Sequence, residues 1–316
     1  MGAAIEDQVE RITAGDRVAI TRAITRVENE REGWERLLSA VYRHTGRALR
    51  IGLTGPPGAG KSTLTQKLIA HYRAEGHRIA VIAIDPTSPF TGGAILGDRV
   101  RMQSETLHPD VFIRSMATRG SLGGLNAKAQ DVADILDAAG FDIIIFETVG
   151  VGQSELDVAQ AADTTVVVLV PESGDSIQAM KSGLMEIADL FVLNKADREG
   201  ADQAVTALRT ILTFRITHAD DEWIPDVIRT VATDASGVEK AAAGIAKHNE
   251  HQRRLGAFEA RRLAREKARV EALVERALRR SFWNDTRRAT LEALLPELGQ
   301  RKQSPLELSH KLMEDA

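Results

Sequence analysis

The octapeptide Gly55-Pro56-Pro57-Gly58-Ala59-Gly60-Lys61-Ser62 constrains this chain most, because it matches the pattern G-x-x-x-x-G-K-[ST] in full. The apolar run Leu49–Thr54 precedes it, and the helical pattern of Lys61–Ala74 follows it. Glycines let the backbone turn tightly and aim its N–H groups at an anion. The positive end of the following helix faces the same point. The sequence therefore predicts a phosphate-binding loop between a buried strand and a helix.

The residues of this loop have distinct expected roles. We expect the Lys61 ammonium to reach the β- and γ-phosphates of a nucleotide and the Ser62 hydroxyl to ligate Mg²⁺. The alternative is a Gly/Pro turn with a solvated lysine, which the flanking strand and helix argue against. The other expected nucleotide contacts in this stretch are Gly55, Pro57, Gly58, Ala59, Gly60 and Thr63.

Short apolar runs alternate with amphipathic segments from about residue 49 to residue 245. Such alternation predicts an α/β fold, a P-loop NTPase core whose mostly parallel, doubly wound sheet is covered by helices on both faces. Most of the runs are rich in Ile and Val, as is typical of strands buried on both faces. The runs are Leu49–Thr54, Ile79–Ile84, Val111–Ser115, Ile143–Phe146, Thr165–Val170, Leu190–Leu193 and Val227–Val231.

Charged, helical segments flank this core. We expect an N-terminal helical extension (1–48) with a pair of helices, a nucleotide-binding domain (49–245) and a C-terminal helical segment (246–316). In the last segment, a long helix over His251–Phe282 and a second over Asp285–Leu298 are predicted. The long helix has an apolar stripe that must pack on the core or on another copy of the chain. The stripe consists of Leu263, Val270, Leu273, Val274 and Leu278.

Composition excludes several classes of protein. Among 316 residues, 43% are hydrophobic and 27% charged, which is ordinary for a globular protein. Lys and Arg total 41 against 45 Asp and Glu, so a basic bias toward nucleic acid or anionic membranes is absent. The absence of Cys excludes disulfides and thiolate chemistry. With neither a signal peptide nor a membrane-spanning stretch legible, we expect a cytoplasmic protein with no nucleic-acid or membrane partner.

The nucleotide base that the site would bind is predicted by Asn194-Lys195-Ala196-Asp197, which directly follows the run Leu190–Leu193. This is the N-K-x-D arrangement of GTP-binding proteins. A carboxylate at Asp197 can accept hydrogen bonds from N1 and the exocyclic amine of guanine, and adenine has no such donor pair. The alternative is a solvated turn, which Asn, Lys and Asp all favour.

Three acidic residues lie at positions typical of a metal–nucleotide site, at the ends of two predicted strands and in a glycine-rich loop. Asp85 ends a strand that we expect Pro86 to stop, and Glu147 ends another and begins a variant D-x-x-G string that reaches Gly150. Asp98 lies in a glycine-rich loop that could order around a γ-phosphate. Ligands collect beyond the carboxyl ends of strands in such sheets. For each acid, a helix cap or a solvated loop carboxylate is the alternative.

With these strings together, the chain resembles the MeaB/ArgK-type GTPases. These are G-protein chaperones of adenosylcobalamin-dependent acyl-CoA mutases, chiefly methylmalonyl-CoA mutase. The strings that carry the resemblance are Gly55–Ser62, Asp85–Arg99, Ile113-Arg114, Arg119–Gly124, Glu147–Glu155 and Asn194–Asp197.

The resemblance implies roles that the residues alone do not. Asp85, Asp98 and Glu147 would act around Mg²⁺ and the attacking water. Lys181 would belong to a third switch that senses the mutase. From the residues alone, Lys181 is a surface helix lysine. The resemblance also implies a homodimer through the C-terminal helices and no cobalamin bound directly by this chain. One departure concerns Ala232, expected near guanine, because its stretch replaces the Ser-Ala pair usual in the family.

Other functions stay open at this point. A small-molecule kinase or transport-linked ATPase would need an acceptor site and a lid, and neither is legible. A metal-delivery GTPase for nickel enzymes would need a His/Cys cluster, whereas His248 and His251 lack a third ligand. No general base is evident, so we expect slow intrinsic hydrolysis that a partner accelerates. Methylmalonyl-CoA, isobutyryl-CoA and ethylmalonyl-CoA mutases are all candidate partners.

Overall fold

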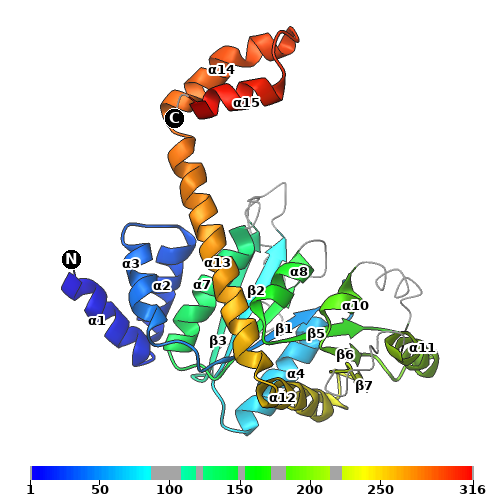
Figure 1. Ribbon diagram of the computed structural model, residues 1–316. Helices are drawn as coiled ribbons and strands as arrows, with labels where there is room; N and C mark the ends of the chain where they lie inside the picture. Colours follow the sequence, from blue (N-terminus) through cyan, green and yellow to red (C-terminus); the bar gives the residue numbers. More distant parts are fainter. Residues whose placement is uncertain are drawn as a thin grey trace. The chain divides into compact units, whose positions relative to one another are not determined.

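The computed structural model describes residues 2–86, 108–118, 124–148, 154–171, 183–213 and 223–314 (Figure 1). The chain divides into two compact units, Met1–Arg262 and Leu263–Ala316. The elements in chain order are α1 (Gly2–Thr13), α2 (Arg17–Glu28), α3 (Trp34–Tyr42), β1 (Leu49–Thr54), α4 (Lys61–Ala74), β2 (Ile79–Pro86), β3 (Val111–Thr118), α7 (Gly124–Ala138), β4 (Ile143–Thr148), α8 (Ser154–Ala161), β5 (Thr164–Leu169), α10 (Leu184–Ile187), β6 (Leu190–Leu193), α11 (Ala201–Thr213), β7 (Val227–Arg229), α12 (Val238–Arg254), α13 (Ala257–Phe282), α14 (Asp285–Gly299) and α15 (Pro305–Glu314).

The first unit contains a seven-stranded sheet in the order β3-β2-β4-β1-β5-β6-β7. Every neighbouring pair is parallel, which confirms the predicted doubly wound α/β fold. The predicted run Ile79–Ile84 is two residues short, because β2 ends at Pro86, which pairs with Thr118 of β3. The residues that follow lie outside the described ranges, so the expectation that Pro86 stops the strand stays a prediction. The pairing of β2 with β4 ends at Ile84, so no strand on that side needs the N–H that proline lacks.

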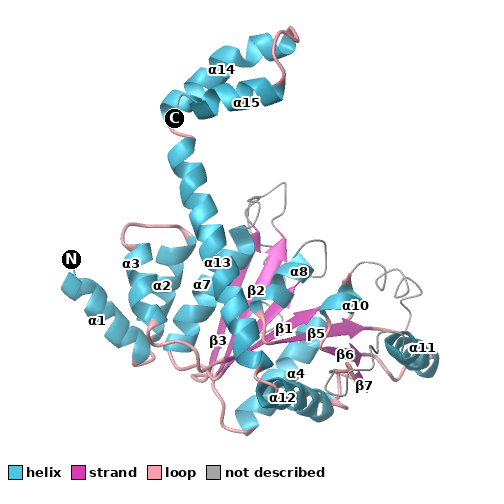
Figure 2. Ribbon diagram, in the orientation of Figure 1, coloured by secondary structure: helices cyan, strands magenta, loops and turns pink. Residues whose placement is uncertain are grey.

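Alternate strand residues pack into different cores on the two faces of the sheet. Ile82 and Ile144 lie in a cluster with α1, α2, α3 and α7. Their neighbours Val81 and Ile145 lie in a second cluster with α4 and α12. Figure 2 shows α4 and α12 side by side, apart from α1, α2 and α3. The two predicted N-terminal helices are α2 and α3. Helix α1 was missed, although its apolar residues Ile5, Val9 and Ile12 recur at helical spacing and pack into the first cluster.

The predicted helix over His251–Phe282 is wrong at its start. Helix α12 ends at Arg254, and α13 begins at Ala257. Between them Gly256 has φ +66°, a left-handed conformation that ends helices and that glycine adopts without steric cost. The second predicted helix is present as α14, from Asp285 to Gly299.

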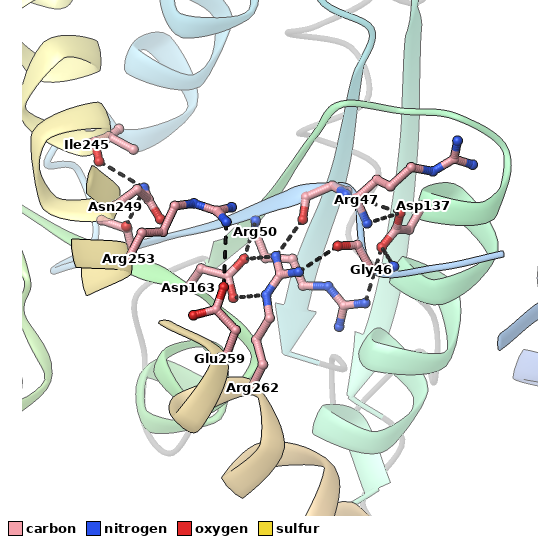
Figure 3. Close-up of polar contacts among 12 residues, drawn as sticks. Gly46, Arg47, Arg50, Asp137, Asp163, Ile245, Asn249, Arg253, Glu259 and Arg262 are labelled. Atoms are coloured by element: carbon pink, nitrogen blue, oxygen red, sulfur yellow. Dashed lines mark hydrogen bonds and ion pairs between the residues drawn. The ribbon is translucent and has the colours of Figure 1, made fainter. Parts of the chain in front are cut away.

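Arg262 anchors the first turns of α13 to the sheet (Figure 3). Its Nε lies 3.0 Å from Oδ1 of Asp163, and its Nη2 lies 2.5 Å from Oδ2. The same guanidinium donates to the carbonyl oxygens of Gly46 at 2.9 Å and Ala48 at 2.7 Å. Asp163 also accepts from the backbone N–H of Arg50. One bidentate arginine therefore holds the chain where the central strand β1 and its neighbour β5 begin.

The second unit contains the rest of α13 with α14 and α15. All five stripe side chains of α13 are exposed in the single chain, from Leu273 at 46% to Leu263 at 73%. The three-part division at residues 48 and 245 stays a prediction. No helix in the described part of the chain is long and apolar enough to cross a membrane.

His248 is fully buried where α12 covers the beginnings of β5 and β6. Its Nδ1 lies 2.8 Å from Oγ1 of Thr164, and its Nε2 lies 3.4 Å from Oδ1 of Asp189. Burial lowers the pKa of His248, with Arg261 and His251 acting in the same direction and the carboxylates of Asp189 and Asp163 opposing them. His248 is therefore neutral at pH 7.

We expect this histidine to make the free energy of unfolding depend on pH. Its pKa is lower in the folded chain than the 6.5 of an ordinary histidine, so the unfolded chain binds the proton more tightly. The stabilisation is complete above pH 6.5 and is lost as the pH falls toward the folded-state pKa. Urea unfolding between pH 7.5 and pH 5 should show a smaller loss of stability in His248→Gln than in the parent. The exposed His44→Gln should behave like the parent, and equal pH slopes in all three proteins would contradict the assignment.

Candidate functional site

The phosphate loop lies against β5 and Asn194 too closely to accept side chains at two of its glycines. Gly55 has φ +136°, and a Cβ there would stand 2.1 Å from the carbonyl oxygen of Val168. Gly60 has φ +87°, and its Cβ would stand 2.3 Å from Nδ2 of Asn194. Glycine is therefore required at both positions by the backbone conformation and by the close approach.

Lys61 begins α4, and only 5% of its surface is exposed. Its Nζ donates to the carbonyl oxygens of Gly55 at 2.7 Å and Pro56 at 3.0 Å. The ammonium thus lies over the loop whose N–H groups and helix N-terminus attract anions. Of the other predicted loop contacts, Pro57 and Gly58 are exposed at the tip.

Ser62 and Glu147 meet beside this lysine. The Ser62 hydroxyl donates to Oε1 of Glu147, whose side chain is buried at the end of β4. The register of the sheet explains the meeting, since Glu147 pairs with Leu53 of β1, directly before the phosphate loop. A hydroxyl and a carboxylate oxygen are ligands that suit Mg²⁺. The predicted metal ligands Ser62 and Glu147 are therefore brought together.

Asn194 connects the phosphate loop to the loop after β7. Its Nδ2 donates to the carbonyl oxygen of Ala59 at 2.8 Å. Its Oδ1 accepts from Oγ1 of Thr230 at 3.1 Å and from the backbone N–H of Ala232 at 3.0 Å. Asn194 is almost fully buried, whereas Asp197, three residues later, is exposed. Within the N-K-x-D motif, the buried Asn194 amide therefore joins the phosphate loop to the loop after β7, and the exposed Asp197 carboxylate is accessible to a ligand.

Thr230 was not predicted as a site residue. It is buried; besides its bond to Asn194, its carbonyl oxygen accepts the backbone N–H of Ala196 at 3.0 Å. The sequence showed only that this stretch departs from the family pattern. The structure shows that a threonine hydroxyl and the Ala232 N–H support the Asn194 amide at this departure. Its position at the end of a strand was the one available signal.

Glu155, in the first turn of α8, is a second group without a predicted role. Burial raises the pKa of this carboxyl, and the Lys61 ammonium partly offsets the rise. Asp85 is described only as backbone at the end of β2. Asp98, Gly150 and Lys181 lie outside the described residues, so their predicted roles stay predictions. Within the described ranges no cluster of three His, Asp or Glu side chains forms a metal site.

The family model described as "Methylmalonyl Co-A mutase-associated GTPase MeaB" matches residues 20–287. The chain belongs to the MeaB/ArgK family of P-loop GTPases. A Pyrococcus abyssi protein named as a GTPase is 45% identical over 312 residues, covering 98% of this chain and 96% of its own. The GTPase ArgK of Escherichia coli is 37% identical over 244 residues, which is 75% of this chain and 74% of that protein.

Two further comparisons extend this MeaB-family assignment. The mouse protein "Methylmalonic aciduria type A homolog, mitochondrial" is 37% identical over 246 residues, 72% of this chain and 59% of that one. The crystal structure of a protein named "LAO/AO transport system kinase" superposes with a TM-score of 0.74 at 27% identity, covering 99% and 98% of the two chains. The predicted resemblance is thereby confirmed, and GTP binding follows from the family.

Proposed function

We propose that this MeaB-family chain hydrolyses GTP to GDP and phosphate and acts as a chaperone of an adenosylcobalamin-dependent acyl-CoA mutase, chiefly methylmalonyl-CoA mutase. The observation that carries the GTPase part is Asn194, whose side chain joins the phosphate loop to the loop that would border guanine. The family model's description and the name of the mouse relative support the partner.

In the proposed reaction, water attacks the γ-phosphorus in line, the bond from that phosphorus to the β–γ bridging oxygen breaks, and GDP leaves. Lys61 and the N–H groups of its loop stabilise the negative charge that spreads over the transferring group. Ser62 and Glu147, with Asp85 and Asp98 by family resemblance, would hold Mg²⁺, which supplies further positive charge at the phosphates. No described residue is positioned as a clear general base for the water. Intrinsic turnover is therefore slow.

The assembly is proposed on similar grounds. The exposed stripe of α13 would be buried against a second copy of the chain, which gives a homodimer. Light scattering at micromolar concentration checks this, and the mass of one 34.4 kDa chain would contradict it. The proposed setting is the cytoplasm, with the mutase rather than this chain binding cobalamin.

Glu147→Gln should lower turnover far more than GDP affinity. The amide keeps an acceptor for the Ser62 hydroxyl but loses the charge that would hold the metal and order the water. Loss of one such group typically costs about 100-fold in kcat. Phosphate release and calorimetry with GDP measure the two effects separately. The exposed Glu239→Gln should match the parent in both, and full activity in Glu147→Gln would refute the role.

A purified cognate mutase should accelerate GTP hydrolysis by about tenfold or more, since a partner that prefers the hydrolysis-competent arrangement raises its population. Lys181→Ala should blunt this stimulation while nucleotide affinity stays nearly unchanged. Absence of stimulation by any cobalamin-dependent mutase of the same organism would remove the chaperone role and leave the GTPase.

The alternative of a small-molecule kinase has one observation in its favour, since the protein in the superposed crystal structure is named as a transport system kinase. The same assay separates the two functions. A GTPase releases the γ-phosphate as inorganic phosphate, whereas a kinase transfers it to an acceptor molecule. Recovery of γ-labelled phosphate on an amino acid or another small acceptor would favour the kinase.

A further inference from the structure

A trough of about 1000 Å³ lies between α1, α2 and the start of α3, and none of the nucleotide-site residues lines it. We call it the α1–α3 trough. Its volume is at the upper end of the range for small-molecule pockets. Arginines are prominent among the side chains that line it, and guanidinium groups pair preferentially with carboxylates and phosphates. These arginines are Arg22, Arg26, Arg31 and Arg36.

The arginines of the trough are only partly neutralised by their surroundings. Arg26 donates to the uncharged Oε1 of Gln8 at 2.8 Å. The side chains of Arg22 and Arg31 are exposed and have no acceptor among the described residues. Three glutamates also line the trough, but Glu30 is already paired with a lysine from α7. The positive charge is therefore in excess.

That lysine is Lys128, which lies in a cage that includes two carboxylates and an aromatic ring. Its Nζ lies 3.1 Å from Oε1 of Glu30, 3.5 Å from Oδ2 of Asp131 and 3.9 Å from the ring centroid of Trp34. Glu30 and Trp34 also line the trough, so it directly borders the cage. The Lys128 side chain is only 14% exposed, which strengthens its interaction with charged neighbours.

The cage lies beside the two elements that flank residues 119–123 in the sequence. Lys128 is in the second turn of α7, which begins at Gly124. Glu28, two residues before Glu30, pairs with Arg114 of β3. The end of α2 and the turn after it therefore contact both β3, which precedes residues 119–123, and α7, which follows them. Residues 119–124 are one of the strings shared with the family.

We propose that the α1–α3 trough is the docking site for an acidic segment of the partner protein. Carboxylates of this segment pair with Arg22 and Arg31, next to Glu30 and Trp34, the two trough residues that contact Lys128. Occupancy thus acts on the start of α7. The identity of the partner as an acyl-CoA mutase rests on the proposed function, whereas the recognition of an acidic chain does not.

Fluorescence anisotropy with labelled octaglutamate tests the site without the mutase. The parent should bind the peptide saturably, and Arg22→Glu/Arg31→Glu should weaken binding by about tenfold or more, since like charges would then face each other. The matched control is Arg43→Glu/Lys247→Glu, which makes the same change in net charge at two exposed residues outside the trough and should bind like the parent. Unchanged GDP affinity shows that each variant is folded. No binding by the parent, or equal binding by Arg22→Glu/Arg31→Glu, would overturn the proposal.

The mutase then tests the identity of the partner. Stimulation of GTP hydrolysis should be lost in Arg22→Glu/Arg31→Glu and kept in the control, with basal hydrolysis unchanged in both. A variant that loses the peptide but keeps full stimulation would overturn the mutase as the occupant. If the mutase does not stimulate GTP hydrolysis even by the parent, the proposed chaperone function is contradicted. The octaglutamate assay still decides whether the α1–α3 trough binds an acidic chain.

Discussion

Lys61→Ala is expected to abolish measurable GTP hydrolysis and to weaken GTP binding. The ammonium is buried over the phosphate loop and held by the carbonyl oxygens of Gly55 and Pro56. A nucleotide phosphate would replace these carbonyls as its partner, and the pairing strengthens as negative charge grows in the transition state. Removing one such charge should lower kcat by about 1000-fold.

Lys67→Ala is the matched control for this substitution. Lys67 lies on the same helix, outside the phosphate-loop motif, and has the same charge. Phosphate release should fall only in Lys61→Ala, and calorimetry should show weaker GTP binding in that variant alone. Equal turnover in Lys61→Ala and the parent would mean that the phosphate loop is not the reaction centre.

Asp197→Asn is expected to change the preferred nucleotide base from guanine to xanthine. The exposed carboxylate has no hydrogen-bond partner in the described part of the chain and is free to accept from N1 and the exocyclic amine of guanine. Two charge-assisted hydrogen bonds together justify a loss of about 100-fold or more in GDP affinity. The asparagine amide can instead donate to the 2-carbonyl of xanthine, so affinity for xanthosine diphosphate should rise.

Calorimetry with guanosine, adenosine and xanthosine diphosphates measures this preference. The parent should bind GDP at least about tenfold more tightly than ADP, because adenine offers no donor pair at this position. The exposed Glu199→Gln, two residues away, should keep the preference of the parent. Equal affinities of the parent for GDP and ADP would contradict guanine recognition.

The positions of the phosphate loop and of the strands were predictable because they depend on local patterns. Leu49–Thr54 is a continuous apolar run, and β1 has these same bounds. The loop glycines, Lys61 and the following helix are contiguous, so their geometry follows from neighbouring residues. The predicted run Ile79–Ile84 was too short where longer-range contacts decide, because Asp85 and Pro86 extend β2 by pairing with β3 alone.

By itself, the sequence determined the family and the α/β class, since each depends on residue types at short spacing. The chemistry that it assigns to the site stays a prediction. Only the tertiary structure decided which distant residues meet. Ser62 and Glu147 are 85 positions apart and touch because β1 and β4 are paired in register. Thr230 supports Asn194 because β6 and β7 are neighbours. Arg262 reaches Asp163, 99 positions earlier, once helix α13 lies at the beginnings of β1 and β5. No local pattern records such pairs, because parallel strands bring together residues separated by whole crossover connections.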